Sequence, residues 1–287
     1  MAETTEQRNY SLIEELRADI DFELDDVISN IVRDLPEEYF QRLKRSDQMT
    51  HLKALLAMSI CHLEEEIVLR SNDDRHVAVV ARQDYPGLLA KILRRLPADK
   101  ALIGAKIFSS KTHEFIIDLF EFDSPDSEEE SDSVDTYAIK TAIEEVVRLT
   151  GQSEPIVSEF ASLYPANSRV LTCPDDLADQ FHAFQKVDDE SGIAVVTKAI
   201  ADCEEKKTIV AANRLTAREV FQQSAQYLGD QAIDIQQAFL NDLCGGARSN
   251  IAVCSFQILP AADNVPVERT GEDLAEFLRS HPGYDLR

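Results

Sequence analysis

The sequence predicts an α+β protein made of two copies of one sandwich of helices and strands, preceded by an N-terminal helical segment. Two observations support this fold class. Stripes of apolar residues at helical spacing alternate with paired β-branched runs that flank turn residues. The same succession of elements then occurs a second time along the chain, as expected after an internal duplication.

The N-terminal helical segment is expected over residues 1–65. In residues 11–33 apolar side chains recur every three or four positions, and acidic residues occupy the opposite side. This pattern predicts a long amphipathic helix. A second helix is expected after Asp47, where leucines again repeat at helical spacing.

The first copy of the sandwich is expected over residues 66–150. Its pattern predicts two strands joined by a turn, then a helix, then two more strands: residues 66–82, 88–96, 101–108 and 113–122. A closing helix is expected from Tyr137. Before it, residues 123–135 contain seven acidic residues and no basic one, so we expect a solvated linker that has nothing to bury.

The second copy becomes visible when the chain is shifted by 131 residues, the difference between positions 182 and 51. This shift places His51 on His182 and residues 76–81 on residues 207–212. Further coincidences at the same shift are Asp99 with Asp230, Ala101 with Ala232 and Phe108 with Phe239. Several matches at one offset indicate a duplication.

The repeat divides the rest of the chain into connecting helices over residues 151–191 and a second copy over residues 192–287. Its closing helix, residues 271–280, is expected in the place of the helix that begins at Tyr137. A histidine duplicated within a helix fits packing better than catalysis, so we expect His51 and His182 to be structural.

Each copy should form a largely antiparallel sheet around a central βαβ crossover, with its helices on one face. This describes a ferredoxin-like sandwich in which an extra N-terminal strand can take the place of the usual last one. The helix that precedes each sheet is expected either to pack across it or to bridge the two copies.

The charge balance restricts the partners that we expect. The chain has 29 basic and 53 acidic residues, a formal net charge of −24. Because nucleic acids and anionic lipids are bound by neutralising their charge, we expect neither a nucleic-acid nor a membrane partner. There is no apolar run of about 18 residues and no secretory pattern at the N-terminus, so the sequence predicts a soluble, cytoplasmic protein.

Metal and nucleophile chemistry have little support in the sequence. The five cysteines form no CxxC pair, which favours reduced thiols over a zinc site. His62 and His76 lie near acidic residues, but their spacing defines no ligand geometry, and surface charge is the simpler interpretation. Neither a GxSxG motif nor a phosphate-binding loop is present. We therefore expect no catalytic residue, metal or cofactor in this chain.

The segment Asp84-x-Pro86-Gly87-Leu88-Leu89, with the strands before and after it, resembles the ACT domain, a βαββαβ module that senses amino acids in metabolic enzymes. The pattern continues in a strand that contains Asp118-Leu119-Phe120. The resemblance implies an amino-acid ligand that contacts Asp84, Tyr85, Pro86, Gly87, Leu88 and Leu89. The second copy keeps the strands but lacks this signature.

A larger part of the chain, residues 30–260, is similar to the N-terminal regulatory part of large bacterial NAD-dependent glutamate dehydrogenases. The similarity rests on Tyr39-Phe40, on His51 and on the tandem order of the ACT-like strands. It implies allosteric control of a linked dehydrogenase domain. The dehydrogenase lysines and the nucleotide-binding GxGxxG loop are missing from these residues.

Elementary chemistry gives the first loop a rationale as a ligand site. Pro86 suits the first turn of a helix, Gly87 allows close approach to the backbone, and the N–H groups at a helix start attract a carboxylate. Asp84 either caps the helix or binds an α-ammonium group. The structural alternative is that Asp84 is only the cap and Gly87 a packing contact.

In the second copy, Thr216-x-x-Glu219 is a capping box that would satisfy the helix start with its own side chains. We therefore expect the second copy to be the weaker sensor and the stronger assembly surface. The leading hypothesis is a non-catalytic amino-acid-binding regulatory region. The alternative is a scaffold for oligomerisation or protein interaction with a vestigial ligand site.

Overall fold

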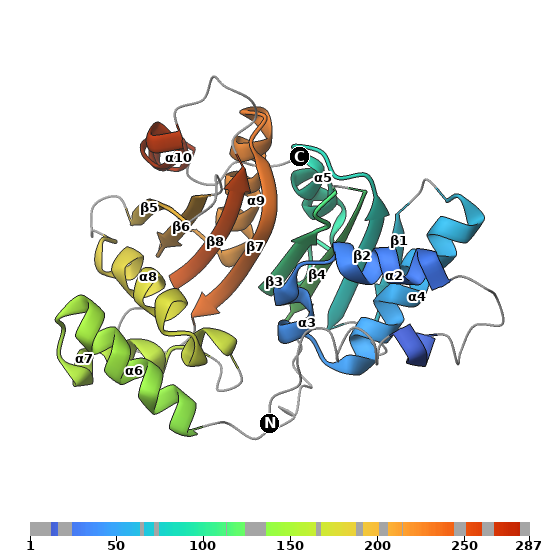
Figure 1. Cartoon of the computed structure of the whole chain (residues 1–287). Helices are drawn as coiled ribbons and strands as arrows, with labels where there is room; N and C mark the ends of the chain where they lie inside the picture. Colours follow the sequence, from blue (N-terminus) through green and yellow to red (C-terminus); the bar gives the residue numbers. More distant parts are fainter. Residues whose placement is uncertain are drawn as a thin grey trace. The chain divides into compact units, whose positions relative to one another are not determined.

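The computed structural model describes residues 13–16, 25–63, 66–71, 75–112, 114–123, 136–164, 168–187, 192–200, 206–213, 215–243, 251–259 and 267–281 (Figure 1). The chain forms two compact units. Unit 1 comprises Met1–Tyr85 with Lys106–Phe120, and unit 2 comprises Pro86–Ala105 with Glu121–Arg287. Among the described helices, none has the length and apolarity needed to cross a membrane.

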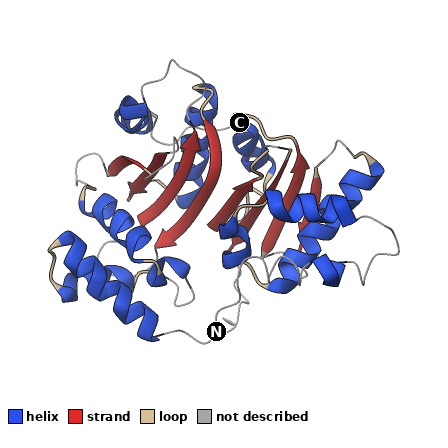
Figure 2. Ribbon diagram, in the orientation of Figure 1, coloured by secondary structure: helices blue, strands red, loops and turns tan. Residues whose placement is uncertain are grey.

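The fold is a mixed α+β arrangement around an eight-stranded antiparallel sheet (Figure 2). The strands are β1 (Ile67–Arg70), β2 (His76–Arg82), β3 (Leu102–Ser109), β4 (Phe115–Phe122), β5 (Ile193–Ala199), β6 (Lys206–Ala212), β7 (Asp234–Leu243) and β8 (Ile251–Leu259). Their order is β1-β2-β4-β3-β7-β8-β6-β5. Each set of four, β1–β4 and β5–β8, thus has the order first, second, fourth, third. The predicted α+β class is confirmed.

Among the helices that precede the strands of unit 1 are α2 (Asp25–Asp34), α3 (Glu37–Arg42) and α4 (Arg45–Cys61). α2 packs on α4, and α4 packs on β2. The helix before the first strand set therefore packs across its sheet, which is one of the two arrangements that we expected.

Tyr39 of α3 anchors these helices in the core of unit 1. Its side chain is fully buried, and its ring lies edge-on to Phe108 with 5.5 Å between the ring centroids. The Tyr39 hydroxyl lies 3.4 Å from the carbonyl oxygen of Gln48 and 3.3 Å from Nδ1 of His51. His51 is thus a packing residue that provides a polar partner for a buried hydroxyl.

Unit 2 covers its strands with helices on both faces. α8 (Pro174–Gln185) contributes Phe181 to an apolar cluster with Ile209, Ala211 and Val253 of β6 and β8. Because neighbouring residues of a strand point to opposite faces, the residues between these belong to the other side. There Phe256 stacks on Phe221 of α9 (Ala217–Asp230), with 5.4 Å between centroids.

The expectation of helices on one face was therefore wrong for the second strand set. Its two inner strands, β6 and β8, are nearly continuous apolar runs that are buried along most of their length. A strand without polar alternation has two apolar faces, and both have to be covered. α9 covers one face and α8 covers the other.

The two helices expected to close the copies are not equivalent. α10 (Val267–Ser280) packs on β5 and α9, with Gly271 close to Thr197. α6 (Thr136–Thr150) packs instead against α7 (Glu154–Ala161), the short helix η1 (Arg169–Thr172) and α8 (Figure 1). The expected pairing of these helices was wrong, because the apolar stripe of α6 joins the cluster around Phe181.

Four features of the sequence lie outside the described residues in whole or in part. They are residues 17–24 of the first amphipathic stripe, residues 72–74 of the first predicted turn, residues 124–135 of the acidic linker and the turn that contains Gly245. The domain boundaries expected from the repeat stay a prediction, because the two compact units reflect contacts within the chain and not its sequence repeat.

His51 is expected to make the protein sensitive to acid. Burial lowers the pKa of His51 to about 4, although the charge of Asp47 acts in the opposite direction. The unfolded chain therefore binds a proton near pH 6.5 that the folded chain binds only near pH 4. The contribution of neutral His51 to the free energy of unfolding should be fully present above pH 7. It should fall by up to about 3 kcal/mol as the pH drops to 4.

Urea unfolding of the wild type and of His51→Gln between pH 4 and pH 8 measures this contribution. The difference in unfolding free energy between the two proteins should shrink as the pH falls. A difference that does not depend on pH would contradict the burial of a neutral His51.

Candidate functional site

The six residues expected to bind a ligand follow β2 and enter α5 (Leu88–Arg95). The division between the compact units falls after Tyr85, so the two ends of this segment are described separately. Tyr85 is 43 % exposed, whereas Leu88 and Leu89 are buried in the core. The two leucines therefore serve packing, and the polar chemistry belongs to the residues before them.

In unit 1, Asp118 of β4 is a buried acid. Asp118 is 1 % exposed, and neither of its carboxyl oxygens has a hydrogen-bond partner among the described residues. Burial, and after it the charge of Asp84, raises the pKa of Asp118 well above its usual range.

An unsatisfied carboxyl at this depth is costly. Leaving a buried polar group without a partner costs about 1–3 kcal/mol, and more when the group is charged. Asp118 sits in the run Ile116–Phe120, whose other members are all apolar. That lone acid in an apolar strand was the signal that the sequence offered, but sequence reasoning did not assign Asp118 to the site.

In unit 2, the start of α5 differs from what the sequence suggested. The N-cap residue is Gly87, which makes no side-chain capping bond. Asp84 is therefore not the N-cap, and Pro86 stands before the cap instead of in the first turn. Both expectations placed the helix start too early, because Gly87 at φ +90° is in the left-handed region that favours glycine.

Gly87 meets the far end of α9. A Cβ atom added to Gly229 would lie 2.6 Å from Cα of Gly87 and 2.9 Å from its nitrogen. A Cβ atom added to Gly87 would instead enter open space. Gly229 is thus the residue that needs to be small, and the backbone of Gly87 is its packing contact.

Arg218, at the start of α9, binds the end of α5. Its guanidinium donates to the carbonyl oxygens of Leu93, Leu96 and Pro97, which lie at the end of α5, with distances of 3.2 Å to Leu93 and 3.0 Å to Leu96. A cation suits these carbonyls because a helix C-terminus carries partial negative charge. α5 and α9 therefore run antiparallel.

The shift of the internal repeat places Gly87 on Arg218. The two equivalent helix starts are thus chemically different. At α9 the capping box is formed as predicted: Thr216 Oγ1 accepts from the backbone N–H of Glu219, and the Glu219 carboxylate accepts from the backbone N–H of Thr216. At α5 the cap position has no side chain.

The remaining candidates from the sequence are dispersed. His182 is exposed, unlike its repeat partner His51, and His62 and His76 are also exposed. Within the described parts of the chain, no group of three or more His, Cys, Asp or Glu side chains has a geometry that suits a metal ion.

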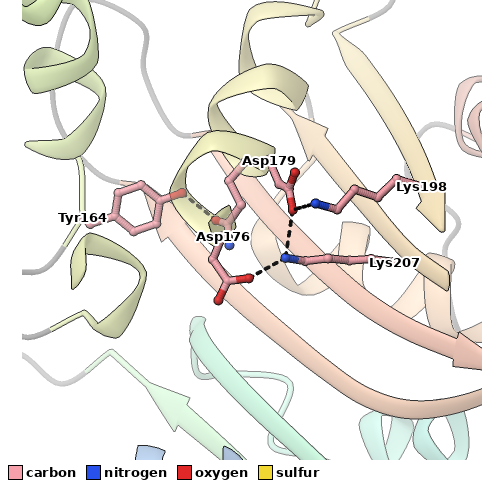
Figure 3. A network of polar contacts seen from close by, with 6 residues as sticks. Tyr164, Asp176, Asp179, Lys198 and Lys207 are labelled. Atoms are coloured by element: carbon pink, nitrogen blue, oxygen red, sulfur yellow. Dashed lines mark hydrogen bonds and ion pairs between the residues drawn. The ribbon is translucent and has the colours of Figure 1, made fainter. Parts of the chain in front are cut away.

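A cluster of ion pairs in unit 2 connects α8 with β5 and β6 (Figure 3). Lys207 binds Asp176 and Asp179, and Lys198 lies 2.5 Å from Asp179. Burial alone would lower the pKa of Lys207, but the charges and hydrogen bonds of the two aspartates outweigh it and the net shift is upward. In the same view, Tyr164 donates a 2.6 Å hydrogen bond to Gln180. These charges are paired with one another, so the cluster is structural.

Comparison with known proteins adds no assignment. No model of a known protein family matches the chain. No curated protein matches it significantly.

Gly229→Ala should destabilise the protein, although alanine is normally the better residue in a helix. The added methyl group collides with the backbone at Gly87, and overpacking of this kind costs about 1–3 kcal/mol. Chemical denaturation measures the loss. Gly104→Ala is the control, because Gly104, like Gly229, has no positive φ, and a Cβ atom there would lie no closer than 3.4 Å to a neighbouring atom. A Gly229→Ala protein as stable as the wild type would rule out the close helix contact.

Lys207→Met should reduce stability by about 2 kcal/mol, because it leaves two aspartates facing each other at a half-buried site. Lys140→Met removes an exposed lysine that pairs with Glu144, and should cost less than about 0.5 kcal/mol. Equal losses for the two variants, measured by urea unfolding, would show that the cluster at Lys207 contributes no more than a surface ion pair.

Proposed function

We propose that the chain is a non-catalytic, amino-acid-binding regulatory region built from two ACT-like units of ferredoxin-like topology. The strand order supports this proposal, since each set of four has the order first, second, fourth, third. This is the order of a ferredoxin-like sheet in which an N-terminal strand takes the place of the usual last one. α5 and α9, which follow the second strand of their respective strand sets, also pack against each other.

One observation carries the assignment of the ligand to the first copy. The two equivalent helix starts differ: α9 satisfies its own N–H groups with a capping box, whereas the cap position of α5 is a glycine without a side chain. A helix start with a glycine cap is suited to an external carboxylate. The resemblance to the ACT domain implies that Asp84 also contacts this ligand.

By the same proposal, the ligand is an amino acid related to nitrogen balance, and the regulated enzyme is an NAD-dependent glutamate dehydrogenase linked to this region. The support is the resemblance of residues 30–260 to the regulatory part of such enzymes. A ligand that binds one arrangement of the region more tightly than another shifts the population between them, and this biases a linked domain.

The contact between Gly87 and Gly229 favours the second candidate function. In that candidate the backbone at Gly87 serves the contact between helices and not a ligand, and the region acts as a scaffold for assembly. The two functions differ in what a small amino acid does to the stability of the protein.

Thermal unfolding with each of the twenty common L-amino acids tests the proposal. A ligand that binds only the folded protein should raise the melting temperature, with about 2.7 kcal/mol of stabilisation at a hundredfold excess over Kd. Gly87→Trp should abolish the shift, because its side chain fills the open space at this corner.

Gly151→Trp is the control for the strain of a bulky residue at positive φ, and it should keep the shift. If no amino acid changes the melting temperature of the wild type, the sensor function is excluded. An unchanged association state of Gly87→Trp in sedimentation experiments would then leave the scaffold as the remaining function.

A further inference from the structure

The first strand of unit 1, β1, is an edge strand with an apolar sequence. It stands at the end of the strand order and, among the described strands, pairs with β2 alone. Val68 is 50 % exposed, Ile67 and Leu69 are half-buried, and Arg70 is exposed. An edge strand with exposed apolar side chains is a template for pairing with another strand.

The register of β1 on β2 shows which of its backbone groups point outward. The backbone N–H of Ser71 donates to the carbonyl oxygen of His76 at 3.0 Å, directly after the last paired residues of β1 and β2. Ser71 and His76 thus form a hydrogen-bonded pair. Because hydrogen-bonded and non-hydrogen-bonded pairs alternate in an antiparallel ladder, Val68 and Arg70 belong to non-hydrogen-bonded pairs. Their backbone N–H and C=O groups therefore point away from β2.

The equivalent edge strand of the second copy, β5, is covered by the chain itself. α10 packs on β5, and a Cβ atom added to Gly271 would lie 2.7 Å from Oγ1 of Thr197 and 3.7 Å from Cγ1 of Val195. Val195 and Val68 occupy equivalent places, since their partners in β6 and β2 coincide at the repeat shift. The helix expected to close the first copy, α6, packs against α7, η1 and α8 instead. Val68 is thus left half exposed where Val195 has a helix beside it.

We propose that β1 pairs antiparallel with β1 of a second copy of this chain, around a two-fold axis at Val68. The strand and its preceding residue read Glu66-Ile67-Val68-Leu69-Arg70. In this pairing each Val68 N–H donates to the carbonyl oxygen of the other Val68. The apolar residues on either side of Val68 face each other, and Glu66 of each copy lies opposite Arg70 of the other.

The backbone and the charges together select this register. Since the outward groups belong to alternate residues, two such strands can shift only by steps that keep residues 66, 68 and 70 opposite one another. An axis at Arg70 or at Glu66 would place like charges directly opposite, which destabilises a strand pair. The axis at Val68 places opposite charges at both ends. The strand is therefore complementary to itself, and this self-complementarity identifies a second copy as the partner.

The inference goes beyond the proposed function, because it names a surface and a partner and does not depend on any ligand. A pair of strands this short buries less than a standard interface of about 1,600 Å². We therefore expect a dimer with a Kd in the micromolar range, formed and released as the protein concentration changes.

Sedimentation equilibrium of the full-length protein across the micromolar range tests the pairing. Val68→Lys places two ammonium groups opposite each other on the axis and should weaken association at least about tenfold. Ile156→Lys is the matched control, because Ile156 of α7 is a β-branched residue with a similar exposure of 46 %, and it should associate like the wild type. Circular dichroism melting of each variant verifies its fold.

An exchange of charges tests the register itself. Arg70→Glu and Glu66→Arg should each associate more weakly than the wild type, because like charges then meet at both ends of the strand pair. An equimolar mixture of the two variants should recover the affinity of the wild type, since their heterodimer has opposite charges at both ends. A variant that had lost its fold would not be rescued by mixing.

A wild type that stays monomeric across the micromolar range overturns the inference, as does a dimer that Val68→Lys leaves intact. Weak association of both charge variants without recovery on mixing also overturns it. The outcomes for the proposed function are separate. A β1-dependent dimer that no amino acid stabilises supports this inference and removes the sensor, whereas a monomer stabilised by an amino acid does the reverse.

Discussion

The backbone contact between α5 and α9 is the interaction on which the candidate site depends. Gly229 has no side chain, so the end of α9 reaches the backbone at Gly87. At the other end Arg218 binds the last carbonyls of α5, which fixes the two helices in one antiparallel register. This register determines where the start of α5 lies and how much space remains beside Gly87.

The two copies share a strand order but not a chemistry. In the second copy a capping box satisfies the start of α9, and Arg218 binds the last carbonyls of α5. In the first copy the cap position of α5 is a glycine, and Asp118 of β4 is a buried acid that has no hydrogen-bond partner among the described residues.

The sequence pattern predicted structure correctly where that structure depends on residues that are close together in the sequence. Spacings of two to four residues can be read directly from the sequence, and they predicted the capping box at Thr216, the strands and their repeated order. It was a poor guide for α6, because an amphipathic helix shows that it has an apolar face but not which surface that face covers. The same limit explains why helices were expected on one face of a sheet whose inner strands are buried on both.

The sequence by itself determined the α+β class, the element order of each set of four strands and the loop at Gly87, since periodicity and turn residues act over short distances. Only the tertiary structure decided that the charge of Asp84 acts on the buried Asp118 and that Gly229 is under steric constraint from Gly87. Both pairings join residues that are far apart along the chain, and they arise from strand order and helix packing. No spacing along the chain records that order, so no reading of spacing alone predicts these neighbours.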